Sequence, residues 1–194
     1  ALHARAELGL VEFAAAHLAD QRQDALGAVG AVGAQPFLEQ LLDLERQAQR
    51  MREHVINAKA VAEWLESDSR IEWVKYSGLA SHPHNARAKK YLPEGPGSVF
   101  SFGVKAAGAL SARETGEKFI NSVKLASHLA NIGDVRTLVI HPASTTHRQL
   151  TDEQLIEAGV PQDLVRISVG IEDLEDILWD LDQALTTATG RGRK

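Results

Sequence analysis

Apolar side chains recur every three or four residues over a long stretch of the chain that begins at Pro36. The positions on this stripe are Phe37, Leu41, Leu44, Ala48, Met51, Val55, Ala58, Ala62 and Leu65. Such spacing is typical of one face of an α-helix that packs on a core. The pattern therefore predicts a long core-facing helix from residue 36 to about Glu66.

Shorter segments downstream alternate between strand-like and helix-like patterns. The strand candidates are 71–76, 98–104, 123–125, 137–140 and 164–169, and the helix candidates are 85–91, 112–121 and 174–185. Strands that alternate with helices form a layered domain. We expect an α/β (α+β) domain with a sheet covered by helices mainly on one face and preceded by the long helix.

The first 35 residues differ from the rest in being rich in alanine and poor in large apolar residues. A helix is expected over residues 5–20, followed by a loop, because Gly27, Gly30 and Gly33 each disfavour a helix. The spacing of these glycines matches neither the dinucleotide nor the Walker phosphate-binding pattern. We therefore divide the chain into an atypical segment (1–35), a domain (36–187) and a basic tail (188–194), which we expect to be frayed from Thr189.

Composition narrows the classes of function. The chain of 194 residues is 44% hydrophobic and carries a net charge of −5, so no overall basic field attracts nucleic acid or an anionic membrane. It contains no cysteine, which excludes disulfides and thiolate chemistry. Its longest apolar runs fall short of the roughly 18 residues of a membrane-spanning helix. We expect a soluble, cytoplasmic protein.

Polar groups concentrate in the segment from Asn131 to His147. It combines a charged loop, the strand candidate 137–140 and a loop that contains Ser144, Thr145, Thr146 and His147. Loops at strand ends often present binding groups. The alternative is structural, because Thr151 before two acidic residues can cap a short helix.

Arg166 lies within the otherwise apolar strand candidate 164–169, on the face shared with Leu164 and Ser168. The planar guanidinium group matches a carboxylate in two parallel hydrogen bonds, so this residue is a candidate receptor for a substrate carboxylate. The alternatives are an internal ion pair with Glu172, Asp163 or another acid, or the solvent-exposed face of an edge strand.

Other catalytic classes find little support in the sequence. The histidines that could be combined into a metal site are His82, His84, His141 and His147. No two of them have the spacing of a metal-ligand pair on one face of a helix. No serine is flanked by glycines in the manner of a hydrolase nucleophile. The sequence therefore predicts no metal site and no serine hydrolase.

Two segments, SHLANIGDVRTLVIHPASTTH and LVRISVGIEDLEDILWDL, resemble the carboxy-terminal domain of O-acetylhomoserine sulfhydrylases. These belong to the cystathionine γ-synthase-like, fold-type I enzymes that use pyridoxal phosphate. The resemblance includes KYLPEGPGSVFSFGVK, WVKYSGLASHP and MREHVINAKAVAEWLE, and thus covers roughly residues 50 to 187.

The resemblance implies roles for two residues. Arg166 corresponds to the arginine that binds the substrate α-carboxylate, and Thr137 to a residue that positions the substrate and the catalytic lysine. The implied reaction of methionine biosynthesis (transsulfuration) joins O-acetylhomoserine with sulfide or a thiol and releases acetate. Pyridoxal phosphate is the implied cofactor, with the smaller domain covering a larger cofactor-binding domain.

The chain also departs from the family. No lysine has the sequence context of the one that binds the cofactor; the lysines are 59, 75, 89, 90, 105, 118, 124 and 194. We therefore expect a substrate-side domain that is inactive unless another chain supplies the cofactor domain. The partners that we expect are such a cofactor-domain chain or further copies in a homo-oligomer. A non-catalytic association domain is the alternative. Upstream of Met51 only fragments match, and one hypothesis is that residues 1–45 derive from a disrupted or misread frame.

Overall fold

The computed structural model describes the backbone of residues 34–193 and the side chains of residues 46–193. The chain divides into two compact units, Ala1–Ala48 and Gln49–Lys194. The second unit begins within helix α2 (Ala34–Glu66), later than the expected domain start at residue 36, and contains the other described helices and strands. The helix expected at 5–20 and the glycine-rich loop after it lie outside the described residues.

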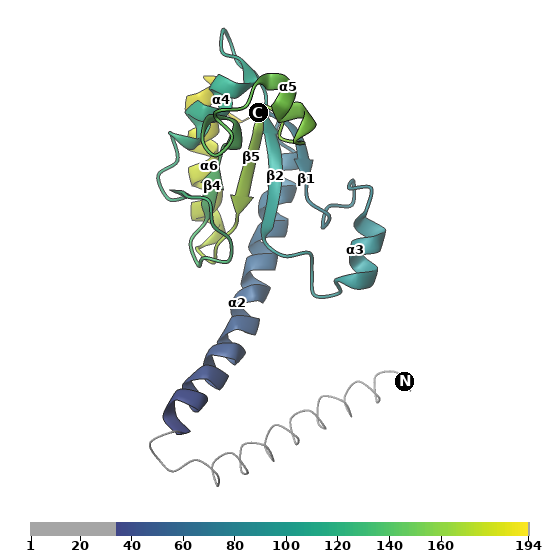
Figure 1. The fold of residues 1–194 in the computed structure, drawn as a ribbon, viewed down its shortest axis with the longest axis vertical. Helices are drawn as coiled ribbons and strands as arrows, with labels where there is room; N and C mark the ends of the chain where they lie inside the picture. Colours follow the sequence, from purple (N-terminus) through teal and green to yellow (C-terminus); the bar gives the residue numbers. More distant parts are fainter. Residues whose placement is uncertain (1–33, 194) are drawn as a thin grey trace. The chain divides into compact units, whose positions relative to one another are not determined.

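After α2, short strands and helices alternate along the chain (Figure 1). They are β1 (Ile71–Lys75), α3 (Asn85–Tyr91), β2 (Val99–Val104), α4 (Ala112–Ile120), β3 (Ser127–His128), β4 (Leu138–Ile140), the 3-10 turn η1 (Pro142–Ser144), α5 (Asp152–Glu157), β5 (Leu164–Ser168) and α6 (Leu174–Thr189). Apart from a few residues at their ends, the helices and strands predicted at these positions are confirmed, with the exception of the strand predicted at 123–125.

The strands form one five-stranded sheet in the order β1-β2-β5-β4-β3. Strand β5 is antiparallel to both of its neighbours, β2 and β4, whereas β3 and β4 are parallel. Ser101 of β2 and Ile140 of β4 lie directly opposite Arg166 of β5. Because β5 has a neighbour on each side, Arg166 lies on an interior strand rather than on an edge.

Helices cover one face of this sheet, as predicted. Successive strand residues point to opposite faces, and the alternate residues Phe100 and Phe102 of β2 and Val165 and Ile167 of β5 join the main apolar core. The helices add residues such as Val61 and Leu65 of α2, Phe119 of α4, and Leu181 and Leu185 of α6. The residues between the core positions, including Ser101 and Arg166, therefore lie on the other face.

The strand predicted at 123–125 is wrong. The carboxylate of Asp180, which is buried on α6, accepts hydrogen bonds from the backbone N–H groups of Lys124 (2.7 Å), Leu125 (2.9 Å) and Ala126 (2.8 Å). A strand would need these N–H groups for a neighbouring strand. The segment is instead a loop bound to α6, and the edge strand β3 begins at Ser127.

The short helices α4 and α5 each begin at a capping box. Ser111 and Glu114 form the box of α4, and Thr151 and Gln154 form that of α5. In each box a side-chain oxygen accepts a backbone N–H that has no partner inside the helix. The capping role predicted for Thr151 is thus confirmed.

The carboxy-terminal residues after α6 keep contacts with the unit. Arg193 Nη2 donates to Ser67 Oγ at 2.8 Å, and its guanidinium group lies 4.4 Å from the centre of the Trp64 ring. The backbone carbonyl of Arg191 accepts a hydrogen bond from Arg70 at 3.2 Å. The expected fraying from Thr189 is therefore not what the structure shows for residues 190–193.

Candidate functional site

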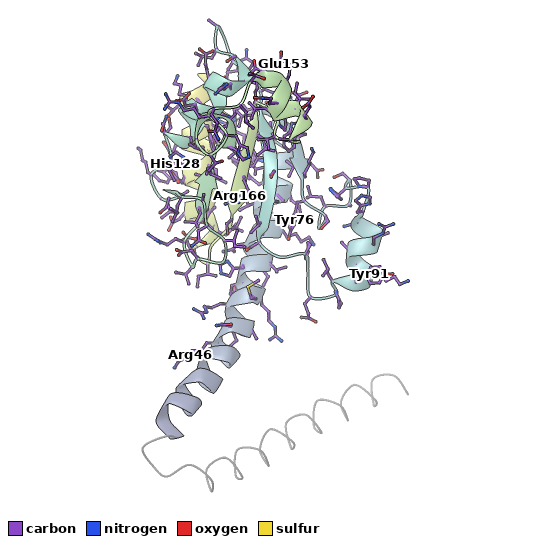
Figure 2. All side chains as sticks on the ribbon, viewed as in Figure 1. Arg46, Tyr76, Tyr91, His128, Glu153 and Arg166 are labelled. Atoms are coloured by element: carbon purple, nitrogen blue, oxygen red, sulfur yellow. The ribbon has the colours of Figure 1, made fainter. Side chains whose placement is uncertain are left out.

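Arg166 is a half-buried arginine on the sheet face opposite the helices, in the middle of β5 (Figure 2). Its Nη2 donates a hydrogen bond to the backbone carbonyl of Asn131 at 3.3 Å. This contact joins β5 to the loop between β3 and β4. The guanidinium group thus reaches an accessible loop and keeps donors that this single carbonyl does not use.

The acidic residues proposed as internal partners of Arg166 are engaged elsewhere. Asp163 Oδ2 accepts from Trp73 Nε1 at 2.7 Å, and Glu172 binds Thr137. Among the described residues no carboxylate forms an ion pair with Arg166. The edge-strand alternative fails as well, because β5 is an interior strand. The described residues therefore supply no internal anionic partner for this side chain.

Thr137 is buried at the beginning of β4, and its polar groups are fully engaged. Its Oγ1 donates to Glu172 Oε2 at 2.9 Å and accepts from the N–H of Gly170 at 2.9 Å, while its own N–H donates to Glu172 Oε1 at 2.6 Å. We call this set of hydrogen bonds the Thr137 clamp. It ties the start of β4 to the turn that follows β5, and Thr137 shares no hydrogen bond with Arg166.

Helix α2 holds the same turn from the other side. Asn57 Nδ2 donates to the carbonyls of Gly170 (3.2 Å) and Glu172 (3.0 Å), and His54 Nδ1 lies 2.6 Å from the carbonyl of Val169. Gly170 has no room for a side chain, since a Cβ atom there would lie 2.4 Å from the Val135 carbonyl oxygen. The turn that follows β5, the strand that contains Arg166, is therefore held both by α2 and by the Thr137 clamp.

The loop 129–136 overlaps the polar segment singled out from the sequence, but the sequence reasoning did not identify its contact with Arg166. Asn131 receives the hydrogen bond from Arg166, and Leu129, Ile132 and Val135 are large apolar residues that are exposed. Position Asn131 gave no signal of its own, because its contact depends on how the loop folds over β5. The one available sign was that the loop belongs to the polar segment singled out from Asn131 to His147.

Side chains of the hydroxyl-rich loop after β4 form hydrogen bonds within the chain. His141 is fully buried; its Nε2 donates to the Gln162 carbonyl at 2.7 Å, so its Nδ1 accepts from Ser144 Oγ at 2.9 Å. Burial lowers the pKa of His141, which favours the neutral ring. Thr145 Oγ1 donates to the His141 carbonyl at 2.8 Å. The side chains of His141, Ser144 and Thr145 are therefore engaged in internal hydrogen bonds and leave few donors for a ligand.

The remaining histidines do not gather into a metal site. His82 and His84 stack edge to face 5.7 Å apart, and His147 lies 2.9 Å from the hydroxyl of Thr146. Over the residues for which side chains are described, no group of three or more His, Asp or Glu side chains is placed to hold a metal ion. The same part of the chain has no helix that is long and apolar enough to cross a membrane.

The described residues do not fit an imine-forming cofactor such as pyridoxal phosphate. An imine lysine lies in a pocket that lowers its exposure to water, yet every described lysine is exposed: Lys59, Lys75, Lys89, Lys90, Lys105, Lys118 and Lys124. Two of them lie over tryptophan rings, and Lys59 lies 3.8 Å from Glu63. Within this part of the chain we therefore find no enclosed lysine that could hold such a cofactor.

Comparison with known proteins identifies the family to which the chain is similar. The family profile described as "Cys/Met metabolism PLP-dependent enzyme" matches residues 4–186. The match begins well upstream of Met51, which counts against a misread frame for residues 1–45.

Individual relatives agree with that profile. The chain is 50% identical over 157 residues to a homocysteine synthase of Schizosaccharomyces pombe, which covers 80% of this chain and 35% of the relative. It is 47% identical over 145 residues to O-acetyl-L-homoserine sulfhydrylase 1 of Thermus thermophilus, with 75% and 33% covered. The chain thus spans about a third of the length of these relatives.

A solved structure is similar in fold as well. A protein described as an O-acetylhomoserine (thiol)-lyase of Campylobacter jejuni, which contains a pyridoxyl-lysine adduct, superposes with a TM-score of 0.63. The two are 37% identical, and the match covers 71% of this chain and 32% of the other. The architecture expected from the sequence, a smaller domain of a pyridoxal-phosphate enzyme, is thereby confirmed.

Proposed function

Because the chain belongs to the family of pyridoxal-phosphate-dependent enzymes of cysteine and methionine metabolism, we propose that it is the substrate-side portion of an O-acetylhomoserine sulfhydrylase. The relatives named homocysteine synthase and O-acetylhomoserine sulfhydrylase indicate the reaction. Sulfide or a thiol replaces the acetoxy group on the γ-carbon of O-acetylhomoserine: a C–S bond forms, the C–O bond to that carbon breaks, and acetate leaves. With sulfide the product is homocysteine.

Arg166 carries the proposal. It is an accessible arginine on an interior strand, its one hydrogen bond goes to the neutral carbonyl of Asn131, and no described carboxylate neutralises it. A guanidinium group in this setting binds a ligand carboxylate through two charge-assisted hydrogen bonds. We assign Arg166 to the α-carboxylate of the amino-acid substrate.

The residues around Arg166 orient it. The carbonyl of Asn131 holds one end of the guanidinium group and so fixes the direction in which the remaining donors point. The Thr137 clamp holds the end of the same loop at Thr137 and Glu172. We therefore assign to Thr137 the positioning of this loop, and through it of the substrate; its engaged hydroxyl argues against a direct contact.

Pyridoxal phosphate, when bound by the enzyme, supplies the electron sink for the reaction. The residues of this chain bind and orient the substrate carboxylate. The cofactor-binding portion would come from a longer form of this protein or from another chain that contains it. A cytoplasmic location belongs to the same proposal.

A reconstitution experiment with two arms tests the function. In the first, the chain is mixed with pyridoxal phosphate and reduced with borohydride; we expect no imine absorption band and no labelled lysine. In the second, the chain is combined, or fused, with the remaining two thirds of the Thermus thermophilus relative. We expect acetate release from O-acetylhomoserine that depends on sulfide and on both parts.

Two outcomes would count against the proposal. A labelled lysine in the chain alone would show that it carries its own cofactor site. A fused protein that folds and binds pyridoxal phosphate, yet releases no acetate from O-acetylhomoserine, would show that this portion does not serve the sulfhydrylase reaction.

A further inference from the structure

Large apolar side chains are exposed near Arg166. Each of them exposes between 37% and 61% of its surface: Met51, Val99, Leu129, Ile132, Val135 and Ile171. We call these six residues the apolar patch. They lie outside the main apolar core, which forms where the helices pack on the sheet. The core of this unit therefore leaves them open to solvent.

Hydrogen bonds place the loop between β3 and β4 beside Arg166. The Asn131 carbonyl accepts from Arg166 Nη2 at 3.3 Å, and Ile132 follows Asn131 directly. Toward the end of the loop, the Val135 carbonyl accepts from the N–H of Ile171 at 2.8 Å, which ties the loop to the turn after β5. Ile132, Val135 and Ile171 are therefore held next to the strand that contains Arg166.

Strand β2 and helix α2 add two more exposed apolar residues. Val99, the first residue of β2, lies opposite Ser168 of β5 and so faces the same side of the sheet as Arg166. On α2, Met51 lies one turn before His54, whose Nδ1 is 2.6 Å from a backbone carbonyl just after β5. The apolar patch therefore follows β5 from Arg166 to the turn after it.

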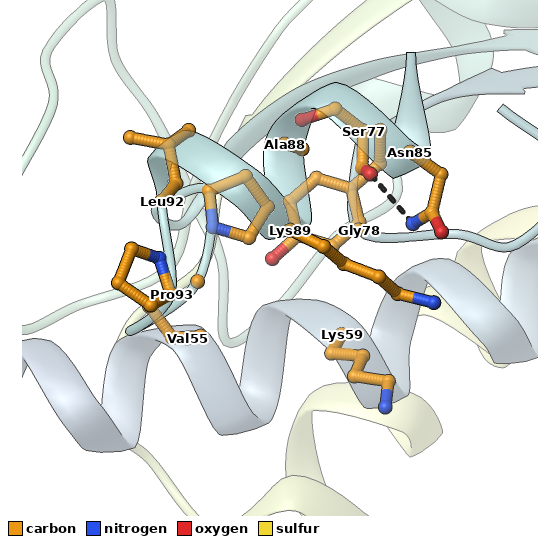
Figure 3. Close-up of a pocket in the computed structure, with 12 residues that line it drawn as sticks. Val55, Lys59, Ser77, Gly78, Asn85, Ala88, Lys89, Leu92 and Pro93 are labelled. Atoms are coloured by element: carbon orange, nitrogen blue, oxygen red, sulfur yellow. Dashed lines mark hydrogen bonds between the residues drawn. The ribbon is translucent and has the colours of Figure 1, made fainter. Parts of the chain in front are cut away.

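A recess of about 190 Å³ between α2 and the segment that contains α3 is a separate feature (Figure 3). Its walls are joined by the hydrogen bond that Asn85 Nδ2 donates to the Ser77 carbonyl at 2.9 Å. None of the residues that line this recess belongs to β5 or to the loop 129–136. The surface that surrounds Arg166 is therefore the apolar patch and not the recess.

The composition of the patch favours a protein as its partner. The centre of a protein–protein interface is apolar, rich in arginine and poor in lysine, aspartate and glutamate. Apolar residues around the single arginine Arg166 match this composition, and the charged residues of the same loop, Asp134 and Arg136, form an ion pair with each other at 3.2 Å. Exposed apolar residues that gather in one place are typical of surfaces that bind other proteins.

The position of Arg166 indicates which protein this is. In the proposed function, Arg166 binds the substrate carboxylate, while the reacting groups belong to a cofactor-binding portion that the described residues do not supply. The α-carbon of an amino acid is bonded directly to its carboxylate. A portion that acts on this carbon or on its amine must therefore lie close to Arg166, and the residues beside Arg166 are the ones that it contacts.

We propose that the apolar patch is the docking surface for the cofactor-binding portion. This inference rests on the proposed function, because Arg166 gives the place at which the two parts meet. Docking removes apolar side chains from water, which favours association. It also excludes water from Arg166, which strengthens its attraction to a carboxylate. A second copy of this chain fits the patch less well, because two copies joined through it would bring two Arg166 guanidinium groups together.

Thiol labelling tests whether the patch is covered. The chain contains no cysteine, so Ile132→Cys introduces a single thiol in the patch, and Ile156→Cys a matched one at an exposed position on α5. Labelling by a maleimide is followed by peptide mass spectrometry, both for the full chain alone and for its fusion to the rest of the Thermus thermophilus relative. We expect the fusion to slow labelling at position 132 by about tenfold or more, because a covered thiol reacts only when the interface opens. Labelling at position 156 should not change.

The outcomes separate this inference from the proposed function. Equal labelling of position 132 in the fusion and in the chain alone would overturn the docking surface, even if the fusion releases acetate. Protection of position 132 in a fusion that releases no acetate would support the docking surface and count against the sulfhydrylase reaction. Labelling that slows in the chain alone as its concentration rises would show that a second copy covers the patch, which contradicts the proposal.

A charge placed in the patch gives a second readout. In the fusion, Val135→Cys serves as the reporter thiol, and Ile132→Asp introduces a charge that docking would have to remove from water. Ile132→Asp should speed labelling at position 135, whereas the control Ile156→Asp, at an exposed isoleucine of α5, should not. Both isoleucines are exposed, so both variants should fold. The same labelling rate with either aspartate would mean that position 132 is not part of the interface.

Discussion

At the residue scale, Thr137 joins two parts of the chain that the site requires to be in register. Its hydroxyl donates to Glu172 and accepts from the N–H of Gly170. Thr137→Val keeps the shape of the side chain but removes the hydrogen-bond partner of the buried Gly170 N–H and of the Glu172 Oε2 atom. We expect the free energy of unfolding, measured by urea denaturation, to fall by about 1–3 kcal/mol.

Two further variants test whether the hydroxyl is responsible. Thr137→Ser retains the hydroxyl and should lose less stability than Thr137→Val. Thr146→Val, at an exposed threonine whose hydroxyl contacts only the adjacent His147, should change the stability by no more than about 0.5 kcal/mol. A Thr137→Val variant as stable as the wild type would show that the Thr137 clamp contributes nothing.

The sequence was sufficient to predict the face of the strand on which Arg166 lies, but not the contacts around it. Alternation along the strand 164–169 was enough to place its side chain opposite Val165 and Ile167, and the structure agrees. The contact with Asn131 and the Thr137 clamp join residues that are 33 to 35 positions apart. Contacts of this range depend on the order of the strands, which local patterns do not contain.

At the element scale, an ion-pair cluster attaches the turn before β1 to the end of α6. Arg70 is buried and donates to Asp68 (Nη2–Oδ2 2.6 Å), to the Asp182 carboxylate and to Thr186 Oγ1 at 2.9 Å. Burial on its own raises the pKa of Asp68, but the hydrogen bonds from Arg70 outweigh it and hold that pKa below its ordinary value of 3.8.

The lowered pKa makes the stability depend on pH in the acid range. A carboxyl whose pKa is lower in the folded than in the unfolded chain stabilises the fold fully above the unfolded pKa, and this contribution is lost as the pH falls through the folded pKa. We expect the free energy of unfolding to decrease as the solution is acidified below about pH 4.

Asp68→Asn removes the group that titrates in this cluster. Urea denaturation at a series of pH values should show a weaker acid dependence in Asp68→Asn than in the wild type. At neutral pH the variant should be less stable by about 1.5–3 kcal/mol, because hydrogen bonds to a charged group are lost. An identical acid dependence in the two proteins would mean that Asp68 is not a source of the effect.

Elements with strong periodicity were predictable, and a short one was not. Helix α2, which is 33 residues long, follows an apolar repeat, strand β2 has apolar residues at alternate positions, and the predicted positions of both are confirmed. The segment 123–125 has apolar residues as well, but Asp180 on α6 binds its backbone N–H groups. Two apolar residues, one on either side of a lysine, carry too little pattern to reveal that a distant carboxylate will accept hydrogen bonds from the N–H groups of this segment.

At the scale of the whole molecule, every described lysine of the unit from Gln49 is exposed, and the carboxylate receptor that we propose in this unit is Arg166. Residues from Met51 onward resemble the family in long runs, which made membership predictable there. The family match from residue 4 was not predictable in the same way, because only scattered residues agree upstream. The proposed sulfhydrylase activity therefore requires that this unit is combined with a cofactor-binding portion.

The central claim is that Arg166 binds the substrate carboxylate, and a comparison of two substrates in the reconstituted enzyme tests it most directly. One substrate is O-acetylhomoserine, and the other is 3-aminopropyl acetate, which lacks the carboxylate. We predict that Arg166→Ala lowers kcat/KM for O-acetylhomoserine by about 100-fold or more, the loss of two charged hydrogen bonds, and leaves kcat/KM for the analogue unchanged. The control Arg87→Ala, at an exposed arginine of α3, should affect neither. An equal loss for both substrates, or no loss for O-acetylhomoserine, would contradict the role of Arg166.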